Sequence, residues 1–192
     1  MAFLRSIDGE TRPFLRTQDL VLRFPRSSDY TDWARLRGLS RGHLEPWEPQ
    51  WADDELSKAA FKVRLRHYER ELRDQAGYAF FLCRAVDEQL IGGLTLTNVR
   101  RGVTQSCAIG YWVGLPHAGR GYMTRAVQAV AGYAFDGLRL HRVEAACLPS
   151  NGASIRVLEK AGFQREGLAR RYLKINGAWQ DHVLFGCLSD DR

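Results

Sequence analysis

The sequence predicts a single α/β domain in which a mixed, mostly antiparallel sheet is flanked by helices. Its 192 residues fit one hydrophobic core and are too few for two domains of ordinary size. The chain is 45% hydrophobic and 26% charged, as folded globular proteins are. Runs typical of strands and runs with helical spacing alternate along it, so both kinds of element are expected in one domain.

One strand and two helices are expected in the first third of the chain. After a frayed N-terminal segment, residues 19–24 are typical of a strand, and a serine at 27 or 28 is expected to cap a helix over about 29–39. Residues 41–53 are rich in Pro and Trp, which indicates an ordered loop. Residues 54–74 carry apolar side chains at helical spacing opposite a charged face, so they predict a second helix.

The middle of the chain predicts an antiparallel meander followed by a helix. Residues 78–86, 89–99 and 106–114 have strand composition and are separated by polar turns. The loop PHAGRG comes next, and residues 122–136 then form one apolar helical stripe that Gly137 is expected to end.

The C-terminal part predicts a strand over 141–148, a short helix over 151–162 and two strands joined by an Asn-Gly turn at 176–177. The whole pattern therefore predicts about seven strands and about four helices.

Composition and charge narrow the class of protein. The longest apolar runs are interrupted by charge within about ten residues, too short for a membrane helix, and the N-terminus lacks a secretory pattern, so a cytoplasmic protein is expected. The formal charge of +6 favours an acidic partner, such as a polyanionic cofactor or an assembly that contains RNA. The cysteines lie in strand-like runs without CxxC or metal-ligand spacing, which predicts reduced, buried thiols and no metal site: Cys83, Cys107, Cys147 and Cys187.

The most informative segment is 110–125, GYWVGLPHAGRGYMTR, in which a strand leads into a glycine-bearing loop that opens a helix. Free N–H groups and the macrodipole at a helix N-terminus bind phosphate, and Gly119 and Gly121 let the main chain approach such a ligand. The alternative is a tight connection without a ligand. The segment is neither a P-loop nor a GxGxxG fingerprint.

A second segment, 151–167, reads NGASIRVLEKAGFQREG. Asn151 is expected to cap the helix of this segment. Ser154 and Lys160 are candidates for contact with a ligand; the alternative is that Ser154 is an ordinary polar residue of the first turn and Lys160 a solvated one. In this order and spacing the two segments resemble the GNAT acetyltransferase superfamily. Residues 140–184 resemble, more closely, the RimJ-type ribosomal-protein alanine N-acetyltransferases. The similarity runs from about Leu15 to the C-terminus, so we expect a GNAT domain with splayed central strands over 15–190 and an N-terminal extension over 1–14.

The resemblance implies acetyl-CoA as co-substrate and no metal. It places the loop glycines on the pyrophosphate, the helix after Asn151 beside the pantetheine arm, and main-chain N–H groups of 111–113 on the acetyl carbonyl. Ala118 and Met123 depart from the side chains common in the superfamily at the loop. The residues implied for acetyl-CoA are Tyr111, Trp112, Val113, Gly119, Arg120, Gly121, Tyr122, Met123, Thr124, Asn151, Ser154 and Lys160.

Acetyl transfer requires a neutral amine, a polarised carbonyl and a proton for the leaving thiolate. Ser154 or Tyr172 is the expected proton donor, with Ser154 preferred because the resemblance places its helix beside the sulfur. The strand RRYLKI lacks the Glu that some relatives carry, so the proton acceptor stays open among Glu144, His141 and Asp181, acting directly or through water.

The loop HLEPWEPQW resembles the substrate-side loop of the RimJ-type group, so His43, Glu45, Trp47 and Trp51 are expected to wall the acceptor cleft; the alternative is packing on the core. The expected acceptor is the N-terminal α-amine, on Ala or Ser, of a protein such as a ribosomal protein. A small-molecule amine acetyltransferase and a non-catalytic, CoA-binding factor associated with the ribosome or RNA are the alternatives. Contact with nucleic acid is expected only through the ribosome, and the chain is expected to be a monomer or homodimer.

Overall fold

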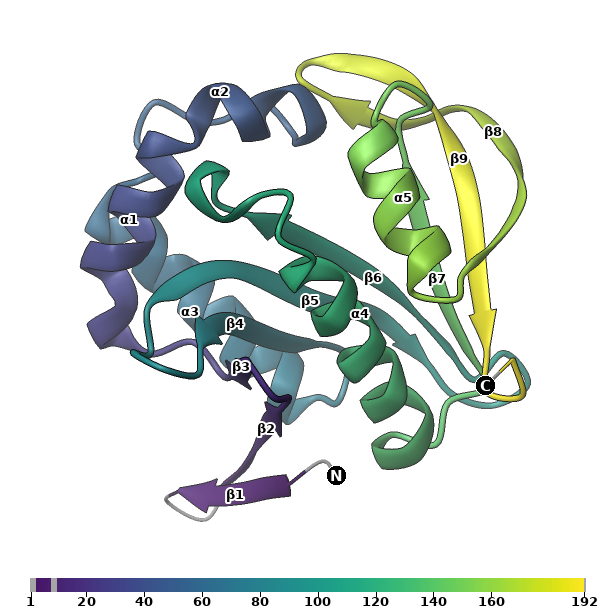
Figure 1. Ribbon diagram of the computed structural model, residues 1–192, viewed down its shortest axis with the longest axis horizontal. Helices are drawn as coiled ribbons and strands as arrows, with labels where there is room; N and C mark the ends of the chain where they lie inside the picture. Colours follow the sequence, from purple (N-terminus) through teal and green to yellow (C-terminus); the bar gives the residue numbers. More distant parts are fainter. Residues whose placement is uncertain (1–2, 8–9, 192) are drawn as a thin grey trace.

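The computed structural model describes residues 3–7 and 10–191, with side chains from residue 12 onward. One nine-stranded sheet runs in the order β1-β2-β3-β4-β5-β6-β7-β9-β8 (Figure 1). Its strands are β1 Phe3–Ile7, β2 Glu10–Arg16, β3 Leu20–Arg23, β4 Tyr78–Arg84, β5 Leu90–Arg100, β6 Ser106–Val113, β7 Arg142–Cys147, β8 Gln164–Ile175 and β9 Ala178–Leu188. The α-helices are α1 Tyr30–Leu39, α2 Arg41–Leu44, α3 Lys58–Arg73, α4 Tyr122–Gly132 and α5 Gly152–Lys160.

The expected sheet is confirmed in its type. Neighbouring strands are antiparallel except β6 and β7, which run parallel. The meander β4-β5-β6 and the β8-β9 hairpin, whose turn is Asn176-Gly177, lie where the sequence predicts them. The pairing gives one continuous sheet along the described residues.

Two strands precede the first one expected. β1 and β2 form a hairpin that continues the sheet beyond β3, with Leu15 opposite Leu22 and buried. The expectation of a frayed segment before residue 19 is therefore wrong for the described part, because pairing with β3 supplies hydrogen bonds that the weak local pattern does not predict. Positions 1–2 and 8–9 of the expected extension lie outside the described residues, and the boundary at residue 15 stays a prediction.

The helix starts also differ from expectation. Neither serine at 27 or 28 caps α1; a 3-10 turn, Ser27–Asp29, precedes it. The Asp29 carboxylate instead accepts the Arg26 N–H at 2.7 Å and pairs with Arg23 at 2.7 Å, and an ionised acceptor beside a guanidinium forms stronger bonds than a hydroxyl. The expected loop 41–53 contains α2 and a 3-10 turn, Glu45–Trp47.

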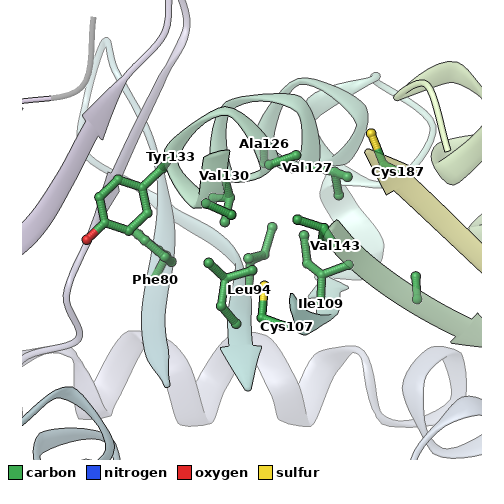
Figure 2. Close-up of a cluster of buried hydrophobic side chains, with 14 of the residues drawn as sticks. Phe80, Leu94, Cys107, Ile109, Ala126, Val127, Val130, Tyr133, Val143 and Cys187 are labelled. Carbon is green, nitrogen blue, oxygen red and sulfur yellow. The ribbon is translucent and has the colours of Figure 1, made fainter. Parts of the chain in front are cut away.

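The two faces of the sheet are covered by different helices. In Figure 1 α4 lies in front of the central strands and α3 lies behind them. Figure 2 shows Val127 and Val130 of α4 above Leu94 and Ile109 of the sheet. Behind the sheet Trp33 of α1 packs on the ring of α3's Phe61, with centroids 4.8 Å apart. The two helical layers therefore leave the strands between them buried on both faces.

Helix α4 ends as the sequence predicts. It continues into a π-helical turn, Tyr133–Gly137, and Tyr133 packs edge to face on Phe80 at 5.9 Å (Figure 2). The cysteines of the sheet strands are free thiols and buried, as expected from their apolar surroundings: Cys83, Cys107, Cys147 and Cys187.

The central strands are splayed, as the resemblance implies. β6 and β7 pair at only three positions: Ser106 with Arg142, Cys107 with Val143, and Ala108 with Glu144. Beyond them β7 pairs only with β9 on its other side, while β6 pairs only with β5. A gap therefore opens between the C-terminal halves of two adjacent parallel strands.

Within residues 3–7 and 10–191, no helix is long and apolar enough to span a membrane. The same residues contain no cluster of three or more His, Cys, Asp or Glu side chains arranged to hold a metal ion.

Gly93 of β5 should tolerate no side chain, because a Cβ there would lie 2.5 Å from Trp112 Nε1 on β6. Gly93→Ala is expected to lower the free energy of unfolding by about 1–3 kcal/mol, the usual effect of overpacking. Urea denaturation would measure it. The matched control is Gly167→Ala, where a Cβ would meet no atom within 4 Å and little change is expected; equal stability of both variants would contradict the prediction.

Candidate active site

The gap between β6 and β7 holds a cleft of about 220 Å³. Tyr111 of β6, Cys147 of β7, Ser154 of α5 and His182 of β9 contribute to its walls. It lies where the sheet's own hydrogen bonding stops, so main-chain groups on the facing edges of β6 and β7 are available to a bound molecule.

The segment 45–51 meets the tip of the β8-β9 hairpin beside this cleft. The N–H of Asn176 in the hairpin turn donates to the Glu48 carbonyl at 2.9 Å, and Trp47 contributes to the cleft wall. Figure 1 shows α2 and the hairpin meeting above the splayed strands. The helical segment and the hairpin together bound the outer end of the cleft.

Helix α5 begins at the cleft because of its cap. Asn151 Oδ1 accepts the Ser154 N–H at 3.0 Å, which confirms Asn151 as the N-cap. Ser154 Oγ lies 2.8 Å from the Tyr111 hydroxyl, so one hydrogen bond spans the cleft from β6 to α5. Burial raises the pKa of Tyr111 well above its ordinary value, so this phenol stays protonated at neutral pH.

The N-terminus of α4 has the geometry of an anion site. Gly119 and Gly121 both have φ of +74°, a conformation that favours glycine, and Gly121 is the N-cap without a side chain to satisfy the first-turn N–H groups. Arg120 lies exposed between them. Free donors, the helix dipole and a nearby cation together fit a pyrophosphate.

The other residues that the resemblance implies for acetyl-CoA lie in three different parts of the structure. Tyr122, Met123 and Thr124 form the first turn of α4, with the Met123 side chain buried in the core. Val113 packs against the main core, and Lys160 lies in the last turn of α5, at the opposite end from Asn151.

A second cavity, of about 450 Å³, lies against the same strand. It is lined by Gly110 and Tyr111, which also line the cleft, and by Trp112. Residues 110 and 111 therefore lie between two spaces: a cavity among α1, α3 and the segment 48–51, and the cleft between the splayed strands.

A stacked ion pair forms one wall of this second cavity. The Arg37 guanidinium of α1 contacts Glu48 at 2.5 and 3.1 Å. Its central carbon lies 4.5 Å from the centroid of the Trp51 ring and 5.1 Å from that of the Trp112 ring. Trp51 Nε1 also donates to Glu48 at 2.8 Å. The sequence analysis identified neither Arg37 nor Glu48. No motif surrounds Arg37, and Glu48 lies in the loop HLEPWEPQW without being singled out from it.

The four residues expected to wall the acceptor cleft do not line one common cavity. Trp51 lines the larger cavity and Trp47 lines the cleft. Glu45 pairs instead with Arg41 at 2.7 Å, and neither Glu45 nor His43 is part of either lining.

The expected proton-transfer residues are also separated. Glu144 pairs with Arg100 at 2.9 Å and Arg142 at 3.0 Å, at the position where β6 and β7 are still joined, and it is not part of the cleft lining. Tyr172 is half-exposed on β8, and its ring makes a T-shaped contact with the His182 ring, with centroids 5.9 Å apart. Of the three predicted catalytic residues, only Ser154 lines the cleft.

The two candidates weighed as proton relays lie elsewhere. His141 precedes β7 and contacts Ser189 at 3.4 Å, while Asp181 Oδ1 accepts the Arg171 N–H at 2.8 Å. Neither is part of the cleft lining.

Comparisons with known proteins agree with this arrangement. A family model described as "Acetyltransferase (GNAT) domain" matches residues 19–164. A "Probable N-acetyltransferase YjcK" of Bacillus subtilis is 38% identical over 92% of this chain and 98% of its own. The "[Ribosomal protein uS5]-alanine N-acetyltransferase" of Escherichia coli is 31% identical over 92% and 91%. The solved structure "Mycobacterium smegmatis RimJ in complex with CoA-disulfide" superposes with a TM-score of 0.85 at 34% identity, covering 90% of this chain and 83% of that one.

Gly121→Glu is expected to weaken acetyl-CoA binding at least about a hundredfold, or about 2.8 kcal/mol, because it brings a negative charge and a side chain to the anion site. A Cβ there would also lie 2.9 Å from Arg125 Nη1. Calorimetric titration would measure it. Gly102→Glu, at a second glycine with positive φ but with no atom near its Cβ position, is the control for backbone strain and should bind normally. Normal binding by Gly121→Glu would contradict the assignment.

Ser154→Ala is expected to lower turnover about a hundredfold with little change in acetyl-CoA affinity, because the role predicted for its hydroxyl is to protonate the leaving sulfur and not to bind the nucleotide. Steady-state kinetics combined with binding titration would separate the two effects. Ser28→Ala, an exposed serine near α1, serves as control. An unchanged rate in Ser154→Ala would remove this residue from the proton-donor role.

Proposed function

This chain belongs to the GNAT acetyltransferase family and is an acetyl-CoA-dependent N-acetyltransferase, and within that activity we propose that its acceptor is the N-terminal α-amine of a protein. The observation that carries the proposal is the charge balance of the larger cavity, which meets the cleft at Gly110 and Tyr111. Domain limits of 15–190 suit this function, since they include both cavities.

The carboxylates of the larger cavity are already paired. Glu48 contacts Arg37 and Glu55 contacts Arg64, each pair at 2.5 Å. The remaining walls are largely aromatic, including Trp33, Trp51 and Trp112. A polyamine requires uncompensated negative charge, whereas this balanced, aromatic surface favours a chain end with at most one charge.

The chemistry of the cleft favours an amine that is easily deprotonated. No carboxylate lines it among the described residues. At pH 7 roughly a tenth of an α-amine but well under a thousandth of a lysine amine is neutral. An α-amine can therefore react with weaker assistance than a lysine side chain needs.

The relatives suggest which proteins carry the acceptor. The Escherichia coli relative is named for an alanine of ribosomal protein uS5, and a second Escherichia coli relative, 27% identical over 62% of this chain, is named a ribosomal-protein-serine acetyltransferase. We infer an Ala or Ser terminus of a ribosomal protein, modified in the cytoplasm. The net charge of +6 suits an RNA-containing assembly, with nucleic acid contacted only through the ribosome. We propose a monomer or homodimer as the acting form.

A thiol-release assay with acetyl-CoA tests the proposal. Peptides that begin with Ala, Ser or Met are compared with an acetyl-Ala peptide that has an internal Lys, with spermidine and with simple amines. A preference of at least about tenfold in kcat/KM for free Ala or Ser termini is expected, because only these combine a low amine pKa with a small first side chain. Mass spectrometry would locate the acetyl group.

Two outcomes would replace the proposal. Turnover on small amines alone would make the chain a small-molecule acetyltransferase. Tight acetyl-CoA binding without turnover on any amine, together with salt-dependent RNA binding, would favour the ribosome-associated factor.

A further inference from the structure

One imidazole lines the cleft between β6 and β7. His182 of β9 is only 2% exposed, and it shares the cleft walls with Tyr111 and Ser154. Its Nδ1 lies 3.0 Å from the Gln180 carbonyl oxygen. A carbonyl can only accept, so in the neutral ring Nδ1 carries the hydrogen and Nε2 keeps the lone pair.

The second ring nitrogen is available to a bound molecule. His182 Nε2 has no hydrogen-bond partner in the part of the chain that the structure describes. It is also absent from the fully buried, unpartnered side-chain atoms of that part, so it keeps some accessible surface. The T-shaped contact with Tyr172 and the hydrogen bond to Gln180 both restrain the ring. His182 therefore brings a restrained ring with an unpartnered Nε2 to the residues that line the cleft.

The other titratable groups of the cleft wall are acids that keep their protons at neutral pH. Burial raises the pKa of the Tyr111 phenol and, as the largest influence, that of the Cys147 thiol. The neighbouring Asp181 is engaged by the Arg171 N–H and is not in the wall. Among the described residues of the lining, His182 is therefore the side chain that offers a nitrogen lone pair as proton acceptor.

We propose that His182 is a catalytic residue whose Nε2 accepts the proton from the attacking amine. The proposal rests on the N-acetyltransferase activity and holds for whichever amine is the acceptor. It differs from the expected candidates in position, because Glu144 and His141 both lie outside the cleft wall.

The step balances as follows. The amine lone pair forms the N–C bond to the acetyl carbon, and the proton that the nitrogen must lose passes to Nε2. The C–S bond then breaks with its electron pair on sulfur, and the thiolate takes a proton from the Ser154 hydroxyl. The imidazolium gives its proton to solvent and Ser154 recovers one, so the products are the amide and the thiol of CoA with no net proton change.

His182→Asn is the decisive variant, because its amide can still donate to the Gln180 carbonyl while it offers no basic nitrogen. We expect kcat to fall about 10²- to 10⁴-fold, with acetyl-CoA affinity unchanged. The acid limb that an imidazole base gives the kcat–pH profile should disappear. The assay uses the full chain and the best acceptor from the amine panel.

His67→Asn, which changes an exposed histidine of α3, is the matched control and should retain wild-type kcat and pH profile. Wild-type kcat with the acid limb intact in His182→Asn would overturn the proposal. A wild-type enzyme that acetylates only small amines would leave this test valid while ending the α-amine proposal.

A second measurement does not depend on the variant folding or on the acceptor. Long-range ¹⁵N–¹H NMR of the wild-type chain at neutral pH should show His182 as the Nδ1-protonated neutral tautomer. An Nε2-protonated ring, or an imidazolium at pH 7.5, would overturn the assignment, since neither has a free lone pair at Nε2.

Discussion

The divergence of β6 and β7 after three parallel pairs is the constraint on which the rest of the site depends. Two adjacent strands that separate leave main-chain donors and acceptors along both facing edges, and buried groups of this kind require a partner. An extended molecule with its own amides, such as the pantetheine arm of acetyl-CoA, can provide one. The Tyr111 and Ser154 hydroxyls bridge the gap at 2.8 Å, so the cleft is spanned by side chains rather than by a strand ladder.

Strand β6 also connects the two cavities. Gly110 and Tyr111 line both, so a group bound beside these two residues is accessible from the cleft and from the larger cavity. The Arg37 pair with Glu48 fixes the wall of that cavity, because its guanidinium is stacked near two indoles as well as bonded to the carboxylate. The site therefore depends on α1, the segment 48–51 and β6 being held together.

Much of the fold follows from local signals in the sequence. The meander, the Asn176-Gly177 turn and the end of α4 near Gly137 are set by alternation, turn chemistry and helical spacing, which act over a few residues. The expectations that failed concern the segment before residue 19 and the serine cap. There a neighbouring strand and the Arg23 pair with Asp29 decided the outcome, and neither is visible from adjacent residues.

The sequence by itself determined the family, the co-substrate and the parts of the site that are short-range: the glycines before α4 and the Asn151 cap with Ser154 three residues on. Only the tertiary structure decided which side chains meet there. In that structure His182 lines the same cleft as Ser154, Glu144 forms ion pairs outside the cleft, and Arg37 pairs with Glu48. The first two of these placements depend on the register of β9 with β7 and on the point at which β6 separates from β7. The third depends on how α1 packs against the segment that holds Glu48. Each joins residues far apart in the sequence or in separate elements, so no local pattern encodes it.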